Sequence, residues 1–181
     1  MLVPQKFDPE LWRSRAYKRY TNAVASGNDH AEAYMRDITN VQYLSALIGW
    51  CRERGLDVEF VNNDTGGAYV RDDRLITINC HLLPEAQLHT LMHECGHHLI
   101  GPRSAEQRYG NGYPADDPGV KRSATHRIDI LDEEFEAWAR GLKLAKRLGV
   151  KIDVERYNRT KAKCITSHLK WTLKFNGKED A

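Results

Sequence analysis

Cysteine is scarce in this chain of 181 residues, and long apolar runs are absent. The four cysteines stand apart and form no C-x-x-C pair, so we expect free thiols in a reducing compartment and no disulfide framework. The longest apolar run, "YLSALIGWC", is far too short to span a bilayer. The start, "MLVPQKFDPELW", lacks the apolar stretch of a secretory signal. We therefore expect a cytoplasmic protein with no membrane partner.

Charge is spread unevenly along a chain of ordinary globular composition, 41% hydrophobic and 29% charged. Residues 141–181 hold 11 Lys or Arg and 4 Asp or Glu, a net charge of +7. Residues 1–140 hold 16 Lys or Arg and 21 Asp or Glu, a net charge of −5. The basic C-terminal region has two interpretations: a solvated helix surface, or a surface for nucleic acid or an acidic partner. Basic and aromatic residues do not alternate there as they do in RNA-binding segments.

The spacing of apolar residues predicts an α+β fold that is mostly helical. Alternation predicts three short strands, which we expect to form a small antiparallel sheet packed beside the predicted helix at 84–101 that follows them. The segment 102–126 has no apolar period and is rich in Gly and Pro, which predicts a long structureless loop. The predicted helices cover 9–26, 30–54, 84–101, 128–148 and 153–174, and the predicted strands cover 56–61, 68–70 and 75–80.

One stretch, "LHTLMHECGHHLIGP" at 88–102, holds four of the eight histidines. His93 and His97 are four residues apart on a predicted helix, so both imidazoles lie on one face and can share a cation. Glu94 lies beside that face, where it can hold a water molecule. Neutral imidazole suits Zn²⁺, and two nitrogens make half of a tetrahedral site. The alternative is a helix whose histidines are only packed or solvated.

A catalytic zinc site needs a third protein ligand and an open fourth position. The acidic helix that contains "LDEEFEAW" is the best source, and Glu134 lies at the edge of its apolar face. Glu133 is the second choice and His126 the third. The side chains that define this apolar face are Leu131, Phe135, Trp138, Leu142 and Ala145. The other acids of the helix are expected to point to solvent: Asp132, Glu133 and Glu136.

The pieces "TLMHECGHHLIG" and "EFEAW" together resemble the gluzincin peptidases, and most of all the ImmA/IrrE family of phage, mobile-element and stress-response metallopeptidases. The resemblance covers roughly 40–148. It implies a zincin-like domain over 1–150, with 151–181 as a basic helical extension. It also implies that His93, His97 and Glu134 bind Zn²⁺ and that Glu94 is the catalytic base. The chain departs from the family at Trp138, where relatives often have Asn or Asp to orient a ligand histidine.

The resulting hypothesis is zinc-dependent hydrolysis of a peptide bond in a restricted intracellular protein, such as a repressor or a host factor. Glu94 would move the proton of the attacking water, and a further group would stabilise the oxyanion. The strand "RLITIN" is expected to be a sheet edge that an extended substrate can join. The candidates for the oxyanion donor are Tyr109, Tyr113, His126, Arg127 and Tyr157.

Two further functions remain open from the sequence. One is a zinc-stabilised binding or regulatory protein without turnover, whose basic C-terminus contacts DNA or a protein partner. The other is a zinc hydrolase that acts on a bond other than a peptide. The oligomeric state is open in all three cases.

Overall fold

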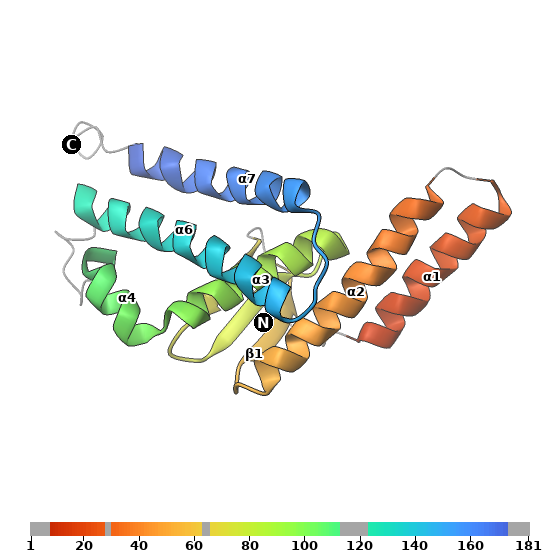
Figure 1. Cartoon of the computed structure of the whole chain (residues 1–181), viewed down its shortest axis with the longest axis horizontal. Coiled ribbons are helices and arrows are strands. Elements are labelled where there is room, and N and C mark those ends of the chain that lie inside the picture. The colour runs from red at the N-terminus through yellow and green to blue at the C-terminus, as the bar shows by residue number, and fades with distance from the viewer. Residues whose placement is uncertain (1–7, 28–29, 63–65, 113–122, 174–181) are drawn as a thin grey trace. The chain divides into compact units, whose positions relative to one another are not determined.

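The computed structural model describes residues 8–27, 30–62, 66–112 and 123–173 (Figure 1). These form a mostly helical α+β fold with one small sheet, which confirms the predicted fold class. The chain divides into two compact units, Met1–Glu94 and Cys95–Ala181. The division falls inside one continuous helix, α3 (Pro84–Ile100).

The first unit contains two helices, a three-stranded sheet and the start of α3. Helices α1 and α2 pack side by side, and Gly55, with φ of +65°, ends the second helix where the sequence predicts a stop (Figure 1). The strands lie within a residue or two of their predicted positions. The bounds are α1 Pro9–Ala25, α2 Ala31–Arg52, β1 Asp57–Val61, β2 Gly67–Val70 and β3 Leu75–Asn79.

The sheet is mixed, with the strand order β1-β3-β2. Strand β3 lies in the middle, parallel to β1 and antiparallel to β2. Two predictions are therefore wrong: the sheet is not purely antiparallel, and "RLITIN" is not an edge. Ile76 and Ile78 of β3 are fully buried, and this apolar strand takes the central place, where both of its sides are hydrogen-bonded. The edges are β1 and β2.

The turn between β2 and β3 is tied to the end of α2 through one side chain. Arg74 has a φ of +51°, in the left-handed region that non-glycine residues seldom adopt. Its guanidinium donates through Nε to the carbonyl oxygen of Gly55 at 3.0 Å and through Nη2 to the carbonyl oxygen of Arg54. Its own carbonyl accepts from the N–H of Asp57 at 3.0 Å. These hydrogen bonds compensate for the strained backbone.

Helix α3 lies across β2, which confirms the expectation that the sheet packs beside it. A Cβ at Gly67 would lie 2.5 Å from Cγ2 of Thr90 and 2.8 Å from the carbonyl oxygen of Thr77, so only glycine fits where helix and strand meet. The buried apolar side chains of the first unit come from α2, the sheet and α3. They include Leu44, Leu47, Ile76, Ile78, Leu88, Leu91 and Met92.

The described residues of the second unit form the end of α3 and four further elements: α4 Pro102–Arg108, η1 Gly110–Gly112, α6 Ala124–Arg147 and α7 Val154–Leu173. The prediction of a structureless segment is wrong for 102–112. Pro102 occupies the first turn of α4, where its missing N–H costs no hydrogen bond, and Ala105 and Tyr109 are buried in a cluster with Ile100 and Ala137. Residues 113–122 lie outside the described part of the chain.

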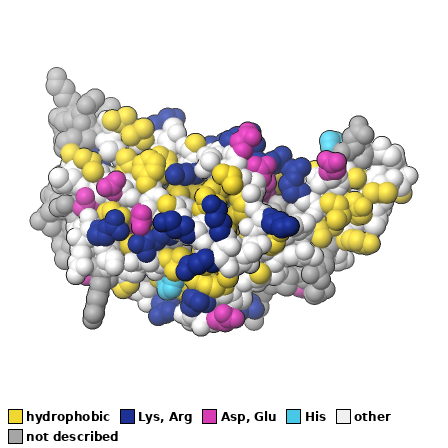
Figure 2. Space-filling view, viewed as in Figure 1, with side chains coloured by type: hydrophobic (Ala, Val, Ile, Leu, Met, Phe, Trp, Pro, Cys, Tyr) yellow, Lys and Arg dark blue, Asp and Glu magenta, His cyan; other side chains and the backbone are white. Residues whose placement is uncertain are grey.

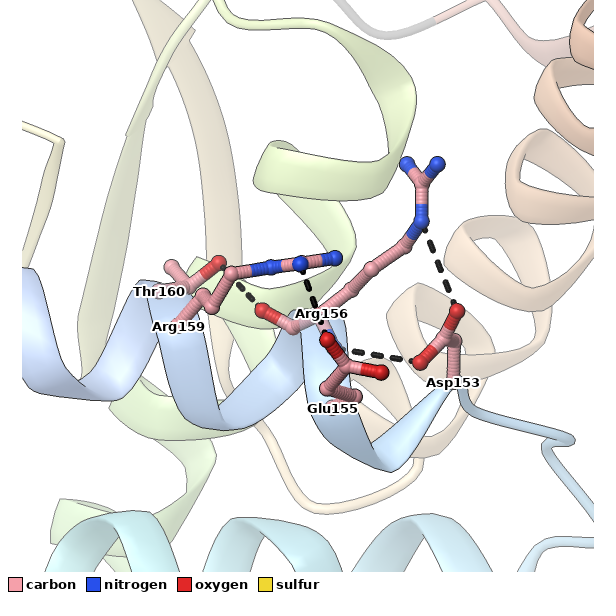
Figure 3. Close-up of polar contacts among 5 residues, drawn as sticks. All are labelled: Asp153, Glu155, Arg156, Arg159 and Thr160. Atoms are coloured by element: carbon pink, nitrogen blue, oxygen red, sulfur yellow. Dashed lines mark hydrogen bonds and ion pairs between the residues drawn. The ribbon is translucent and has the colours of Figure 1, made fainter.

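Helices α6 and α7 run side by side (Figure 1). The hydroxyl of Tyr157 donates to the carbonyl oxygen of Trp138 at 2.8 Å, and the two rings meet edge to face at 5.2 Å. At the start of α7, Asp153 accepts from the backbone N–H of Arg156, which caps the helix (Figure 3). The predicted boundary at residue 150, with 151–181 as an extension, stays a prediction. No helix among the described residues has the length and apolar character needed to cross a membrane.

Candidate metal centre

Three side chains on consecutive turns of α3 form a group that could hold a metal ion. They are His93, Glu94 and His97, and their ligand atoms all lie within 4.8 Å of one another. His93 is 7% exposed and Glu94 is 5% exposed. Because the group lies on one helix, local helical geometry alone brings it together, as the four-residue spacing predicts. The structure therefore confirms a possible metal site without identifying the metal.

The ring of His97 lies between two glutamates of α6. Its Nδ1 is 2.9 Å from Oε1 of Glu133, and its Nε2 is 3.3 Å from Oε1 of Glu134. The side chains of His97, Glu133 and Glu134 are only 13%, 5% and 12% exposed. An ionised carboxylate only accepts, so Nδ1 carries a proton in the hydrogen bond to Glu133, while Nε2 faces the second carboxylate.

This arrangement fits a cation between His97 and Glu134. An imidazole lone pair and a carboxylate oxygen repel each other unless a proton or a metal ion lies between them. Two ligand atoms that are each about 2.0–2.1 Å from a tetrahedral zinc ion lie about 3.3–3.4 Å apart. The observed 3.3 Å between Nε2 and Oε1 matches that separation. The donor set of imidazole and carboxylate also suits zinc chemically.

Of the two glutamates, Glu133 lies in a place that the sequence did not predict. Glu134, the first choice as third ligand, faces the Nε2 atom of His97. Glu133, predicted to point to solvent, is 4% exposed and faces Nδ1, so that prediction is wrong. Phe135, predicted to belong to the buried face, is 43% exposed and is covered on one side by Lys161, whose Nζ lies 5.3 Å from the ring centre. The buried face of α6 is rotated toward its small residues.

Small residues set that rotation. A Cβ at Gly96 of α3 would overlap the backbone carbonyl of Ala137 in α6, so the two helices approach as closely as backbones can. The preceding residue of α3, Cys95, is fully buried. Farther along, Arg140 donates to the carbonyl oxygen of Leu99 and thereby holds α6 against the end of α3.

The carboxylate of Glu133 accepts a hydrogen bond from the imidazole of His97 and so orients the ring, a role that the sequence assigned to no residue. The indole of Trp138 cannot accept a hydrogen bond, so it cannot hold the N–H of a histidine ring. Here Trp138 is 1% exposed and packs on Tyr157, while Glu133 holds the imidazole of His97. A carboxylate that accepts from the second ring nitrogen is the usual partner of a metal-binding histidine.

Two of the candidate oxyanion donors are core residues. Tyr157 is 1% exposed, its hydroxyl donates to Trp138, and burial raises its pKa far above the ordinary value. Tyr109 is 5% exposed within the apolar cluster of α4 and α6, and burial also raises its pKa. Both positions favour packing over catalysis. Tyr113, a further candidate for the oxyanion donor, lies outside the described residues.

The other two candidates lie at the start of α6, against α7. His126 is 8% exposed and meets the ring of Trp171 edge-on at 6.0 Å. Arg127 donates to the carbonyl oxygen of Trp171 at 2.8 Å and lies over its ring. His126 precedes Glu134 by eight residues, or about 12 Å along the helix axis. Its roles as catalytic donor or third ligand stay predictions.

One residue near the site was missed in the sequence. His168 of α7 places Nε2 at 3.5 Å from Oε2 of Glu134. The signal was available: Tyr157, Lys161 and His168 recur at helical spacing on one side of α7, which identifies its inward face. The basic character of the C-terminal region hid this period.

Comparison of the chain with protein-family models, with curated proteins and with solved structures gave no match.

Proposed function

We propose that the chain is a zinc-dependent metallopeptidase of the gluzincin kind that resembles the ImmA/IrrE family. The observation that carries the proposal is the position of His97 between Glu133 and Glu134, next to His93 and Glu94 on α3. In this proposal His93, His97 and Glu134 hold the metal, and Glu133 orients His97. A bound zinc ion would lower the pKa of its water and polarise the scissile carbonyl.

The residues of the chain supply the remaining chemistry. Glu94 takes the proton of the attacking water and passes it to the leaving amine, which is general acid–base catalysis by one carboxylate. Its low exposure, 5%, keeps bulk water away and strengthens its electrostatic contacts. The small exposed fractions of His93 and Glu94 favour a narrow range of substrates over general proteolysis. A cytoplasmic repressor or host factor would suit such a site.

The first experiment measures metal content after purification without added metal or chelator. We expect about one zinc ion per chain, as for a catalytic site with three protein ligands. His93→Ala and Glu134→Gln should each lose most of it. A wild-type protein that takes up no zinc, even after incubation with Zn²⁺, would overturn the proposal.

The second experiment tests turnover with a library of peptides and a parallel panel of simple esters and amides. Glu94→Gln should retain the metal and lose at least about 10²-fold in rate, the lower range for a general acid–base residue. Cleavage confined to the ester panel would support a hydrolase acting on a different bond. A wild-type protein that binds zinc but cleaves nothing would favour the binding protein.

The binding alternative has one observation in its favour. Lys and Arg side chains gather in the region of α6 and α7, with apolar side chains between them (Figure 2). Some of this charge is already balanced: Arg159 pairs with Glu155 at 3.0 Å and Arg156 with Asp153 at 3.4 Å (Figure 3). If this surface binds DNA, affinity should fall steeply with salt. The exposed basic residues are Lys143, Lys146, Arg147, Lys151, Arg159, Lys163 and Lys170.

A further inference from the structure

The carboxylate of Glu134 lies between two imidazoles, with one oxygen toward each. Oε1 is 3.3 Å from Nε2 of His97, and Oε2 is 3.5 Å from Nε2 of His168. The side chain of Glu134 is 12% exposed and that of His168 is 35% exposed. The three groups form a row from α3 through α6 to α7, so the second helix of the pair takes part in the arrangement.

Contacts on both sides of His168 fix its position. Toward the start of α7, Tyr157 bonds to Trp138 and Lys161 covers Phe135. Toward its end, Trp171 accepts a hydrogen bond from Arg127. Because α7 is held to α6 at both ends, the backbone of His168 is fixed on the side of α7 that faces Glu134, within reach of its carboxylate.

We propose that His168 is a positioning residue for Glu134. Its Nε2–H donates to Oε2, which leaves Oε1 for the metal and holds the carboxylate as a ligand through one oxygen. At 3.5 Å the contact is at the outer limit of a hydrogen bond, and such contacts often shorten when a site is filled. The inference rests on the proposed metal site. It makes α7 part of that site, although the sequence favoured an appended helix.

The chemistry of carboxylate ligands supports this role. A carboxylate can bind a metal through one oxygen or two, and a donor on the second oxygen selects the first mode. Loss of such a partner usually weakens metal binding by about 10–100-fold. The row of His97, Glu134 and His168 has the order that this role requires. Oε1 of Glu134 lies on the side of His97 and the proposed metal, and Oε2 lies on the side of the donor His168.

The test compares His168→Ala, His168→Gln and Lys170→Ala in the full chain. Lys170 is an exposed residue on the same helix, so Lys170→Ala is the matched control. Zn²⁺ affinity is measured by competition with a chelator, and ligand geometry by the visible spectrum of the Co²⁺-loaded protein. His168→Ala should weaken Zn²⁺ binding about 10–100-fold and change the cobalt spectrum. His168→Gln, which keeps an N–H donor at similar reach, should restore most of the Zn²⁺ affinity and most of the wild-type cobalt spectrum. Lys170→Ala should change neither the affinity nor the spectrum.

A double-variant cycle separates positioning from loss of folding. In the Glu134→Gln background, His168→Ala should cause no further loss of affinity, because the partner of the imidazole is already changed. Wild-type affinity and spectrum in His168→Ala would overturn the inference and leave the proposed function standing. Equal further losses in both backgrounds would also overturn it. A wild type that binds zinc, depends on His168 and cleaves no peptide would overturn only the peptidase, and a wild type that binds no zinc would overturn both.

Discussion

The backbone of Gly96 lies against the carbonyl group of Ala137 so closely that no side chain fits between them. This contact brings α3 and α6 together one residue before His97 and three residues after Glu134. The two sides of the candidate metal centre are therefore positioned by a close backbone contact. Any atom added there would move the carboxylates away from the imidazole.

Gly96→Ala should destabilise the protein and weaken metal binding. The added methyl group overlaps backbone, which cannot rotate aside, so we expect a loss of about 1–3 kcal/mol or more in the free energy of unfolding. Denaturant unfolding and zinc titration measure the two effects. The matched control is Gly49→Ala in α2, where nothing lies within 4 Å of the added Cβ. That variant should be stabilised by about 0.5–1 kcal/mol, because alanine favours a helix. Equal effects of the two changes would contradict the packing argument.

Glu133 and Glu134 should respond differently to the same substitution. Glu134→Gln replaces a proposed ligand and should weaken zinc binding by far more than about 100-fold, so that only weak, measurable binding by the two histidines is left. Glu133→Gln replaces the charged acceptor that orients His97 by a neutral amide oxygen and should weaken zinc binding by at most about 10–100-fold. Chelator competition on both variants, with unfolding curves as a check on folding, distinguishes the two. The reverse order of effects would make Glu133 the ligand.

Tyr157→Phe should change stability and not chemistry. The variant removes the donor to the Trp138 carbonyl in a buried place, at a cost of about 1–2 kcal/mol. Thermal unfolding should show the loss. Zinc affinity and kcat/KM per folded molecule should stay at the wild-type values. A selective fall in kcat would restore Tyr157 as a candidate oxyanion donor.

Asp37→Asn should stabilise the protein at neutral pH. Burial, and then the nearby carboxylate of Glu85, raises the pKa of Asp37 in the folded state. The ionised side chain therefore destabilises the fold above that pKa, and the penalty disappears as the pH falls through it and the acid becomes protonated. The advantage of the variant should shrink in acid, as followed by unfolding from pH 7 down to pH 4. Asp72→Asn, at an exposed turn position, is the control and should show no such trend.

Most of the correct predictions came from the spacing of residues within a single helix or strand. His93, Glu94 and His97 come together through helical spacing on one element, which needs no knowledge of the fold. Glu134 followed from its angle on α6. Glu133 was misplaced because the inward face was judged by large apolar side chains, whereas Gly96 and Ala137 set the actual contact. Close packing of small residues leaves little hydrophobic signal in a sequence.

The same spacing patterns could not predict which elements pair with one another in the fold. The alternation in β1 and β3 predicts strands but not that they pair in parallel, because that pairing depends on where β2 and the helices go. The spacing along α7 places His168 on the inward face, but its importance depends on which residue of α6 lies opposite it. Neither relationship is encoded in the spacing of residues along one element.

The hydrogen bonds of Arg74 have a consequence for how the first unit opens. One side chain joins the β2–β3 turn to the carbonyl groups of Arg54 and Gly55, just after α2, so the two turns are held together while these hydrogen bonds last. Amide hydrogens of the hairpin and of the closing turn of α2 should therefore exchange with solvent as one cooperative group. Arg74 would thus decide which amide hydrogens exchange through local fluctuations and which exchange only when the whole group unfolds.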